Sequence, residues 1–323
     1  MSPTGRVTRA EVAARAGVST AVVSYTLNGG PKNVAPATRD RVLAAVRELG
    51  YRPNATARAL RLGSTGQIGL VVATMSNPYF GQLTDETERA AAARGLALLV
   101  RTNSARDLTT AVEQLAERQV DGLLIAQSMD EASTAAVRAT GVPTVLINEA
   151  TAPDGVASVG VDRFGGARTA VEHLLGHGHR SVAFIGAAPG EDRRRGWSDA
   201  LRAAGLGEGP AVEAEYSREG GYRGARRLLA LDQPPTALLA GSDEQGLGAL
   251  LALHEAGARV PEDVAVVAFD GSIASAYAWP PLTTVTQPTQ EMVGRALDLL
   301  LQPGEPQQSI LAPALVRRRS CGC

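Results

Sequence analysis

The chain has 323 residues, which is long enough for two or three domains. Hydrophobic residues make up 44% and charged residues 20%, so wholesale disorder is excluded, and no apolar run approaches the roughly 20 residues of a membrane-spanning helix. The start, MSPTGRVTRA, lacks the apolar segment of a secretory signal, and two cysteines, Cys321 and Cys323, are too few for a disulfide framework. These features predict a chain that works in a reducing cytoplasm and not in a membrane.

The net charge of −1 conceals an uneven distribution along the chain. Residues 1–62 contain ten basic and three acidic residues, a charge of +7, whereas the remainder contains 22 basic and 30 acidic residues, a charge of −8. A basic amino-terminal segment on an acidic body is typical of a protein that binds a polyanion. An arginine-rich surface that only aids solubility is the alternative, and charge alone does not decide between the two.

Two short helices separated by a tight turn are predicted near the amino terminus. Thr8 and Glu11 fit a capping box, in which each side chain satisfies a free amide at the start of a helix. The first helix is therefore expected over residues 9–16, and it ends at the glycine that follows. Ser19 is the expected cap of a second helix, which runs to about Asn28 and stops at a Gly-Gly-Pro sequence.

A third helix is expected from Pro36, which suits a first helical turn, to Gly50. Its apolar residues fall on one face at helical spacing, and apolar residues of the first two helices can pack against them. A small three-helix core is therefore predicted. The residues concerned are Val12, Val23, Leu27, Val42, Leu43, Val46 and Leu49.

Residues 51–63, YRPNATARALRLG, form a separate piece. Pro53 can begin a helix and Gly63 can end one, which leaves roughly two helical turns between them. A helix that short is marginal in water without tertiary support. This segment is predicted to be a linker that orders only when another surface holds it.

From Gln67 onward, short apolar runs alternate with amphipathic helical stretches. Fully apolar strands joined by helices are typical of parallel sheets that are covered on both faces. More chain is present than one six-stranded sheet needs, so an α/β architecture with two lobes is predicted. The strand-like runs include 68–73, 96–100, 122–126, 143–148, 181–186, 236–241 and 264–269, and the helical stretches include 79–94, 106–118, 165–175, 193–204 and 243–256.

The stretch VTRAEVAARAGVSTAVVSYTLNG (7–29) has the spacing of a helix-turn-helix. With the runs that follow it in order, the chain resembles the lac repressor/galactose repressor family of bacterial transcription regulators. These runs span nearly the whole chain, so the resemblance is specific. They include TRDRVLAAVRELGYRPN (38–54), ARAL (57–60), IGLVV (68–72), NPYF (77–80), VDGLL (120–124), VEHLLGHGHRSVAFIG (171–186), VPEDVAVVAFD (260–270) and PPLTTV (280–285).

The resemblance implies three parts. They are a helix-turn-helix domain over residues 1–52, a hinge helix or linker over 53–64, and a core over 65–323 similar to periplasmic binding proteins. Within that core, the first lobe is expected at about 65–162 and 288–308, and the second at about 163–287 and 309–318.

The resemblance also places the second helix in the major groove of DNA. Residues on that helix and at the start of the third are then expected to face base edges or phosphates, namely Thr20, Ala21, Ser24, Tyr25, Asn28, Thr38 and Arg39. Hydroxyl and amide groups can bond to bases or phosphates, and a methyl group can contact thymine. Many members of the family have an arginine where this chain has Tyr25, which cannot make the bidentate contact to guanine.

In the hinge, the resemblance implies that two short helices of a dimer enter the minor groove at the operator centre. Leu60 would wedge between base steps, with Ala57 one turn earlier and Arg58 near the phosphates. Such wedges unstack and kink the duplex. The alternative is that Leu60 covers the surface of the first lobe.

For the core, the resemblance implies a small molecule between the lobes. Arg193 offers a fork of donors and Asp270 an acceptor, which suits a sugar or another polyol. Asp270 could equally terminate a strand, and Trp279 could stack on a ring or merely pack. The remaining expected contacts are Ser76, Asn77, Tyr79, Phe80, Asn148, Val161, Ser242 and Asp243. Many sugar-binding members carry asparagine where this chain has Ser242.

Other signals are weaker. His177 and His179 have a spacing that can hold a metal, but they precede a strand without an evident Cys or carboxylate partner, so a turn is favoured and no metal is expected. The carboxyl-terminal Cys321-Gly-Cys323 is expected to be a frayed end. No nucleotide-binding or nucleophile-elbow motif is present, and no cofactor is expected.

The combined interpretation is a homodimeric, ligand-responsive regulator, and most simply a repressor, that binds a palindromic operator in double-stranded DNA. The expected effector is a sugar, with a nucleobase as the alternative. A two-lobed solute receptor without a DNA role is a rival, which the basic head and the missing signal disfavour. An α/β enzyme that uses Asp270 or His179 as acid or base is a second rival, which the absence of a nucleophile–base signature disfavours.

Overall fold

The computed structural model describes residues 7–28, 33–52, 63–103, 107–302 and 304–323. The chain divides into two units, Met1–Thr65 and Gly66–Cys323. Within the described residues, no helix is both long and apolar enough to cross a bilayer.

The amino-terminal unit contains the three helices expected from the sequence. Val12, Val23 and Val42 are fully buried at their centre, and Tyr51, which the apolar pattern did not include, joins this core. Leu43 was expected in the core but does not belong to this cluster. The helices are α1 (Arg9–Ala16), α2 (Thr20–Asn28) and α3 (Pro36–Leu49).

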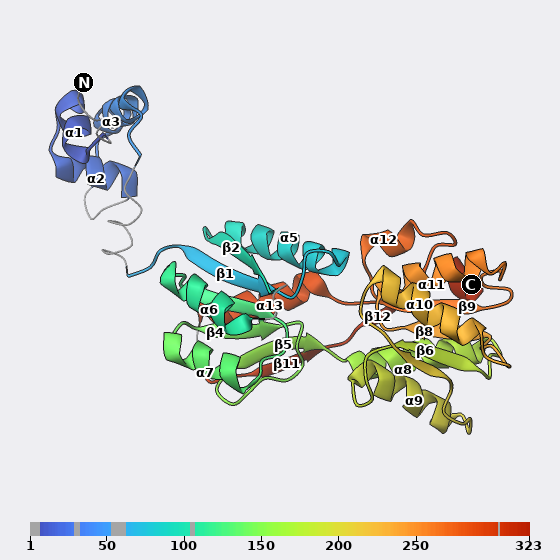
Figure 1. Cartoon of the computed structure of the whole chain (residues 1–323). Coiled ribbons are helices and arrows are strands. Elements are labelled where there is room, and N and C mark those ends of the chain that lie inside the picture. Colours follow the sequence, from blue (N-terminus) through green and yellow to red (C-terminus); the bar gives the residue numbers. More distant parts are fainter. Residues whose placement is uncertain (1–6, 29–32, 53–62, 104–106, 303) are drawn as a thin grey trace. The chain divides into compact units, whose positions relative to one another are not determined.

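The carboxyl-terminal unit consists of two lobes, each built on a six-stranded sheet (Figure 1). The first sheet has the order β11-β5-β4-β3-β1-β2 and is entirely parallel. Its strands are β1 (Gln67–Val72), β2 (Ala97–Thr102), β3 (Gly122–Ala126), β4 (Thr144–Ile147), β5 (Ala157–Val161) and β11 (Gln308–Leu311). Its helices are α5 (Pro78–Ala93), α6 (Leu108–Glu117), α7 (Glu131–Thr140) and α13 (Thr289–Leu301).

Apolar residues cover both faces of this first sheet. On β1, Ile68 and Leu70 pack with α5 and α13, while Val71 faces the opposite way and packs with α6. Successive side chains of a strand point to opposite faces, so a fully apolar strand supplies two cores at once.

The second sheet has the order β12-β10-β9-β8-β6-β7 and is parallel except for the pairing of β10 with β12. Helices α8 and α9 pack on one face, and α10 and α11 on the other. The strands are β6 (Val182–Gly186), β7 (Ala211–Glu213), β8 (Ala237–Ala240), β9 (Ala265–Asp270), β10 (Thr283–Thr286) and β12 (Ala314–Val316). The helices are α8 (Arg163–Gly176), α9 (Asp192–Ala203), α10 (Arg218–Leu229), α11 (Asp243–Glu255), α12 (Ile273–Ala276) and the 3-10 turn η1 (Arg319–Cys321).

The chain passes between the two sheets three times, after β5, after β10 and after β11. The last passage lies between Leu311 and Ala314, whereas the sequence placed it near residue 308. Strand β11 is short and partly polar, so its apolar pattern carries little information about which sheet it joins. Because three segments connect the lobes, a change in the angle between them bends all three.

Candidate functional site

Capping bonds hold the helix pair of the amino-terminal unit in place. The Glu11 amide donates to the Thr8 hydroxyl at 3.3 Å and the Thr8 amide donates to the Glu11 carboxylate at 2.7 Å, so the predicted capping box is confirmed. Hydrogen bonds from Thr8, from its backbone above all, lower the pKa of Glu11. Gly17 ends α1 with a left-handed φ of 64°, and the Ser19 hydroxyl accepts from the Val22 amide at 3.4 Å.

Packing determines which face of α2 reaches solvent. Val23 is fully buried and packs in one cluster with Val12 and Val42. Thr20 and Ala21 lie in the first turn of α2 and are exposed. The first turn of this helix is therefore free to contact another molecule, as the second helix of a helix-turn-helix requires.

The other residues expected to contact DNA differ in accessibility. Tyr25 is partly exposed, whereas Ser24 is only 9% exposed. In the first turn of α3, Thr38 is partly exposed and Arg39 is exposed. Asn28 ends α2, but its side chain lies outside the part of the chain that the structure describes.

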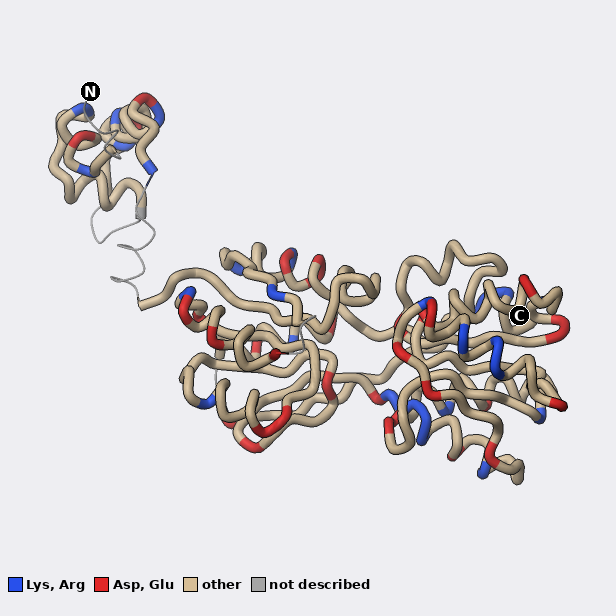
Figure 2. The backbone as a smooth tube through the Cα atoms, in the orientation of Figure 1, with Lys and Arg blue, Asp and Glu red and all other residues tan. Residues whose placement is uncertain are grey.

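Arginines occupy both α1 and α3 of this unit, as the blue segments of the tube show (Figure 2). Arg15 is paired with Glu48 at 2.7 Å, so part of the positive charge is neutralised within the unit. Three residues expected in the hinge, Ala57, Arg58 and Leu60, lie outside the described residues.

A cavity of about 980 Å³ lies between the two lobes of the carboxyl-terminal unit. From the first lobe, the segments that follow β1, β2 and β3 line it, and from the second lobe the segment that follows β7. Ligands of open α/β sheets bind at the carboxyl ends of the strands, and this cavity has that position. Its polar lining includes Thr74, Asn103, Gln127, Asp130, Glu215, Tyr216 and Ser217.

A chain of buried hydrogen bonds connects the two lobes. The Tyr79 hydroxyl, on α5 of the first lobe, lies 2.8 Å from Asn148 Oδ1 and 3.2 Å from Gln287 Oε1. The Gln287 amide donates to Asp270 Oδ1 at 3.0 Å. Asp270 ends β9 of the second lobe, and Gln287 lies just after β10, at a passage between the sheets. Burial, above all, raises the pKa of Tyr79, so the phenol stays protonated.

Two members of this chain have unusual backbone angles. Asn148 has a φ of 64° and Asp270 a φ of 113°. The left-handed conformation is tolerated by asparagine, but a φ of 113° is costly for a residue with a Cβ, by about 1 to 3 kcal/mol. Such conformations gather at functional sites, so the backbone supports a functional role for Asp270.

Arg193 lies at the start of α9 and is nearly buried. Its Nε donates to Glu191 Oε1 at 3.0 Å and its Nη1 donates to the Gly241 carbonyl. The guanidinium lies over two rings, 4.8 Å from the centroid of Tyr216 and 5.0 Å from that of Phe269. Through Tyr216 this arginine adjoins the cavity. Burial disfavours its charge, but the neighbouring Tyr216, Glu191 and Asp270 raise the pKa of Arg193 overall.

Asp243 and Asp270 are buried carboxyl groups of the second lobe. Burial, with a smaller effect of Asp243, raises the pKa of Asp270 to about 7 against the opposing effect of Arg193. Burial also raises the pKa of Asp243 to about 6, although this carboxylate accepts bonds from the Ser272 amide at 2.5 Å and the Thr284 hydroxyl at 2.6 Å. Near neutral pH these two groups are therefore close to their titration points.

Several residues expected at the effector site have structural roles. Asn77 caps α5 by accepting from the Tyr79 amide at 2.9 Å, and Ser242 caps α11 by accepting from the Gln245 amide at 3.2 Å. Val161 is 1% exposed in the core of the first lobe, and Phe80 packs against that core.

The remaining two expected residues are exposed. Ser76 bonds to the Thr74 hydroxyl at 2.8 Å, and Thr74 lines the cavity. Trp279 is 83% exposed, and its ring lies 5.7 Å from the guanidinium carbon of Arg319. The structure therefore brings together Tyr79, Asn148 and Asp270 in one bonded chain and leaves Trp279 outside it.

Sequence reasoning missed two contributors. Gln287 bridges the lobes and lies two residues after the run PPLTTV, so its place after a strand was an available signal. Tyr216 lines the cavity and stacks on Arg193, but it follows the three-residue strand β7, which is too short to be recognised from its pattern.

The carboxyl terminus differs from the expectation. Cys321 belongs to η1 and is 1% exposed, so this end is packed and not frayed. His177 also has cysteine neighbours, because its Nε2 lies 3.5 Å from Cys323 Sγ. The sequence argument paired His177 with His179, two residues away, and could not detect a partner 146 residues along the chain.

Comparisons with known proteins agree with both units. Residues 8–54 match the model of bacterial regulatory proteins of the lacI family, and residues 171–321 match that of a periplasmic binding protein-like domain. The HTH-type transcriptional repressor PurR of Erwinia tasmaniensis is 33% identical over 96% of this chain and 95% of its own. The ribose operon repressor of Escherichia coli K12 is 32% identical over 97% of this chain and 99% of its own.

Solved structures extend the similarity to the fold. The lac repressor dimer bound to operator and the anti-inducer ONPF has a TM-score of 0.85 and 29% identity, and the similarity covers 98% of this chain and 99% of that one. The transcriptional regulator CelR in complex with cellobiose has a TM-score of 0.73 and 33% identity, and the similarity covers 98% of this chain and all of that one.

Proposed function

The chain belongs to the lacI family of bacterial regulatory proteins, and from this premise we propose that it is a repressor that binds a palindromic operator as a homodimer. The observation that carries the proposal is the joint presence of a helix-turn-helix unit and a two-lobed core with an interlobe cavity, in a chain similar to named repressors over nearly its whole length. A two-fold symmetric dimer requires an operator of matching symmetry.

DNA recognition is assigned to the face of α2 that packing leaves exposed. On this helix Thr20 and Ala21 are exposed and Tyr25 is partly exposed, and Arg39 supplies a phosphate contact from α3. The excess of positive charge in residues 1–62 contributes the part of the affinity that does not depend on sequence and that falls with salt. The segment with Leu60 would add contacts in the minor groove.

The effector is proposed to be a sugar held in the interlobe cavity. A volume of about 980 Å³ accommodates a ligand larger than a monosaccharide, and amide and carboxylate side chains on the first lobe can bond to hydroxyl groups. Arg193 and Asp270 do not line the cavity, but Arg193 stacks on its lining residue Tyr216 and interacts electrostatically with Asp270. From this side of the second lobe the two residues can supply donors and an acceptor to a ligand that extends toward them. A nucleobase is the alternative ligand, and it would favour stacking on Tyr216.

Control of DNA binding is proposed to act through the angle between the lobes. The bonded chain from Tyr79 through Gln287 to Asp270 stabilises one interlobe arrangement. An effector that bonds to Asp270 competes with Gln287 and so shifts the equilibrium between arrangements. The sequence of the linker predicts a helix that is too short to be stable by itself, so a small shift would change whether it orders on DNA.

A regulator of this kind acts in the cytoplasm and has no enzymatic activity. The named relatives are transcriptional repressors, which supports this assignment over an enzyme or a solute receptor. A raised pKa such as that of Asp270 is also found in enzyme acids, but here the carboxyl accepts a hydrogen bond from Gln287 within the chain that connects the lobes.

The test begins with a thermal-shift screen of sugars and nucleobases on the full-length protein. Random duplex DNA is then selected with and without the compound that stabilises the protein, at moderate ionic strength. We expect an inverted repeat to be enriched. We also expect the Kd for this repeat, measured by fluorescence anisotropy, to change at least tenfold when the compound is added. Failure to enrich any inverted repeat under either condition would refute the proposed repressor function.

A further inference from the structure

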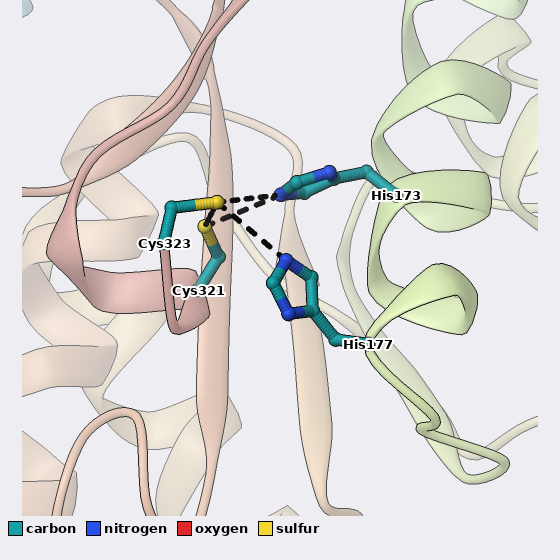
Figure 3. A group of neighbouring side chains, drawn as sticks. All are labelled: His173, His177, Cys321 and Cys323. Atoms are coloured by element: carbon teal, nitrogen blue, oxygen red, sulfur yellow. Dashed lines mark hydrogen bonds between the residues drawn. The ribbon is translucent and has the colours of Figure 1, made fainter.

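Four side chains with metal-ligand chemistry meet in the second lobe, away from the interlobe cavity. His173 lies in the last turn of α8, and His177 lies one turn later at the end of that helix. Cys321 and Cys323 lie at the carboxyl terminus. Figure 3 shows both imidazole rings pointing from the helix toward the two sulfur atoms. Their nearest ligand atoms all lie within 4.8 Å of one another.

We propose that these four residues bind one zinc ion, and that this ion fastens the carboxyl terminus to α8. Zinc prefers a tetrahedral set of cysteine and histidine ligands, and two of each is a common set for structural sites. Two thiolates also balance the charge of the ion, so a neutral centre forms in a partly buried place. Binding releases the thiol protons to solvent.

The distances agree with this geometry. A zinc ion with bonds of about 2.0 Å to nitrogen and about 2.3 Å to sulfur holds tetrahedral ligand atoms about 3.3 to 3.8 Å apart. His173 Nε2 lies 3.3 Å from Cys321 Sγ and 3.4 Å from Cys323 Sγ, and His177 Nε2 lies 3.5 Å from Cys323 Sγ. The two sulfur atoms are 3.3 Å apart. Rotation of the exposed His177 ring can bring its ligand nitrogen closer to the other ligand atoms, which all lie within 4.8 Å of one another.

The surrounding structure holds Cys321 in position. The Ser320 hydroxyl donates to the Val266 carbonyl at 2.6 Å and accepts from the Thr283 amide at 2.8 Å, so the turn before the terminus is anchored to the sheet. The Thr283 hydroxyl lies 3.0 Å from Cys321 Sγ, where it can donate to a metal-bound thiolate. Such outer contacts orient ligands and tune their affinity.

The full-length protein, without any histidine tag, tests this assignment. It is reduced, stripped with a chelator and titrated with Zn²⁺ in competition with a chromogenic chelator. We expect one equivalent to bind, Co²⁺ to give the visible bands of a tetrahedral thiolate complex, and Zn²⁺ to raise the melting temperature.

Two single variants and one control separate this site from other causes. Cys323→Ala and His177→Ala remove exposed ligands, and each should weaken Zn²⁺ binding by at least about tenfold and abolish the cobalt bands. His179→Ala is the matched control, because His179 follows in the same turn but bonds to Thr236 at 3.0 Å. It should leave the affinity unchanged.

Three outcomes would overturn the assignment. The first is the absence of Zn²⁺ binding by the reduced protein. The second is a Zn²⁺ affinity that stays within tenfold of the natural protein's in both ligand variants. The third is a loss of affinity in the His179→Ala control that equals the loss in those variants. A purely structural disulfide would also overturn the assignment, and this would be shown by aerobic protein that has lost the mass of two hydrogen atoms together with reduced protein that does not bind Zn²⁺. All these readouts are independent of DNA and effector binding.

Discussion

At the scale of single residues, polar groups in the core are bonded to one another before any ligand is considered. Asp270, Gln287 and Tyr79 form one chain across the lobes, and Arg193 is held by Glu191 and by two aromatic rings. A ligand that reaches these groups must replace existing bonds, so its binding is coupled to the arrangement of the lobes.

Replacement of either charged residue should remove the response to effector. Arg193→Ala and Asp270→Ala each delete a bonding group of the proposed site, so the effector-dependent shift in operator affinity should fall by at least tenfold, while DNA binding persists. Anisotropy titrations with and without the effector measure this. Arg195→Ala, on the exposed face of the same helix, is the control. Loss of DNA binding with an intact response would contradict the assignment.

Tyr25 should contribute to base preference. Tyr25→Arg introduces a side chain that can bond to both acceptors of guanine, so selection from random DNA should yield a changed base at one position of each half-site, with discrimination of about 1 to 3 kcal/mol. Tyr25→Phe retains the ring and serves for comparison. An unchanged preference in Tyr25→Arg would show that this position does not read sequence.

At the scale of elements, short local signals set the helix ends. Thr8, Gly17 and Ser19 act within a few residues of their own positions, and the helix-turn-helix depends on all three. The sheets are different, since their strands pair with partners far along the chain. Strand β12, for example, pairs with β10, and β11 with β5.

The turn between α1 and α2 offers a direct test at this scale. Gly17 has a φ of 64°, and nothing lies within 4 Å of a Cβ at this position, so Gly17→Ala adds backbone strain without a steric clash. We expect a loss of about 1 kcal/mol in the stability of the amino-terminal unit. Chemical denaturation, with hydrogen exchange of the helix amides as the probe, measures this loss of stability. Gly17→Asn should lose less, because asparagine tolerates this conformation, and equal losses would argue against strain as the cause.

At the scale of the whole molecule, two lobes joined by three segments place a strained, buried Asp270 next to a passage between them. The pKa of this carboxyl is raised from 3.8 to about 7 in the folded protein. A folded state that holds the proton more tightly than the unfolded chain is favoured at low pH. Stability from this group is therefore complete below pH 3.8 and is lost as the pH rises toward about 7.

The stability of the carboxyl-terminal unit should follow this sign. Between pH 5 and pH 7, Asp270 alone should lower the free energy of unfolding by on the order of 2 kcal/mol. Asp270→Asn removes the titration and should flatten this part of the profile, although Asp243, whose pKa is also raised, keeps a smaller slope. Urea unfolding across this pH range measures both. A variant with the slope of the natural protein would exclude Asp270 as its source.

The sequence alone was sufficient for the three amino-terminal helices, seven of the core strands, the two-lobed α/β class and the family. Capping pairs, left-handed glycines and apolar runs act locally, and local signals can be read along the chain. Only the tertiary structure placed Gln287 between the lobes, Tyr216 beside Arg193, and two terminal cysteines against His173 and His177. These contacts join residues far apart in sequence, and they arise when the sheets are assembled and the lobes pack.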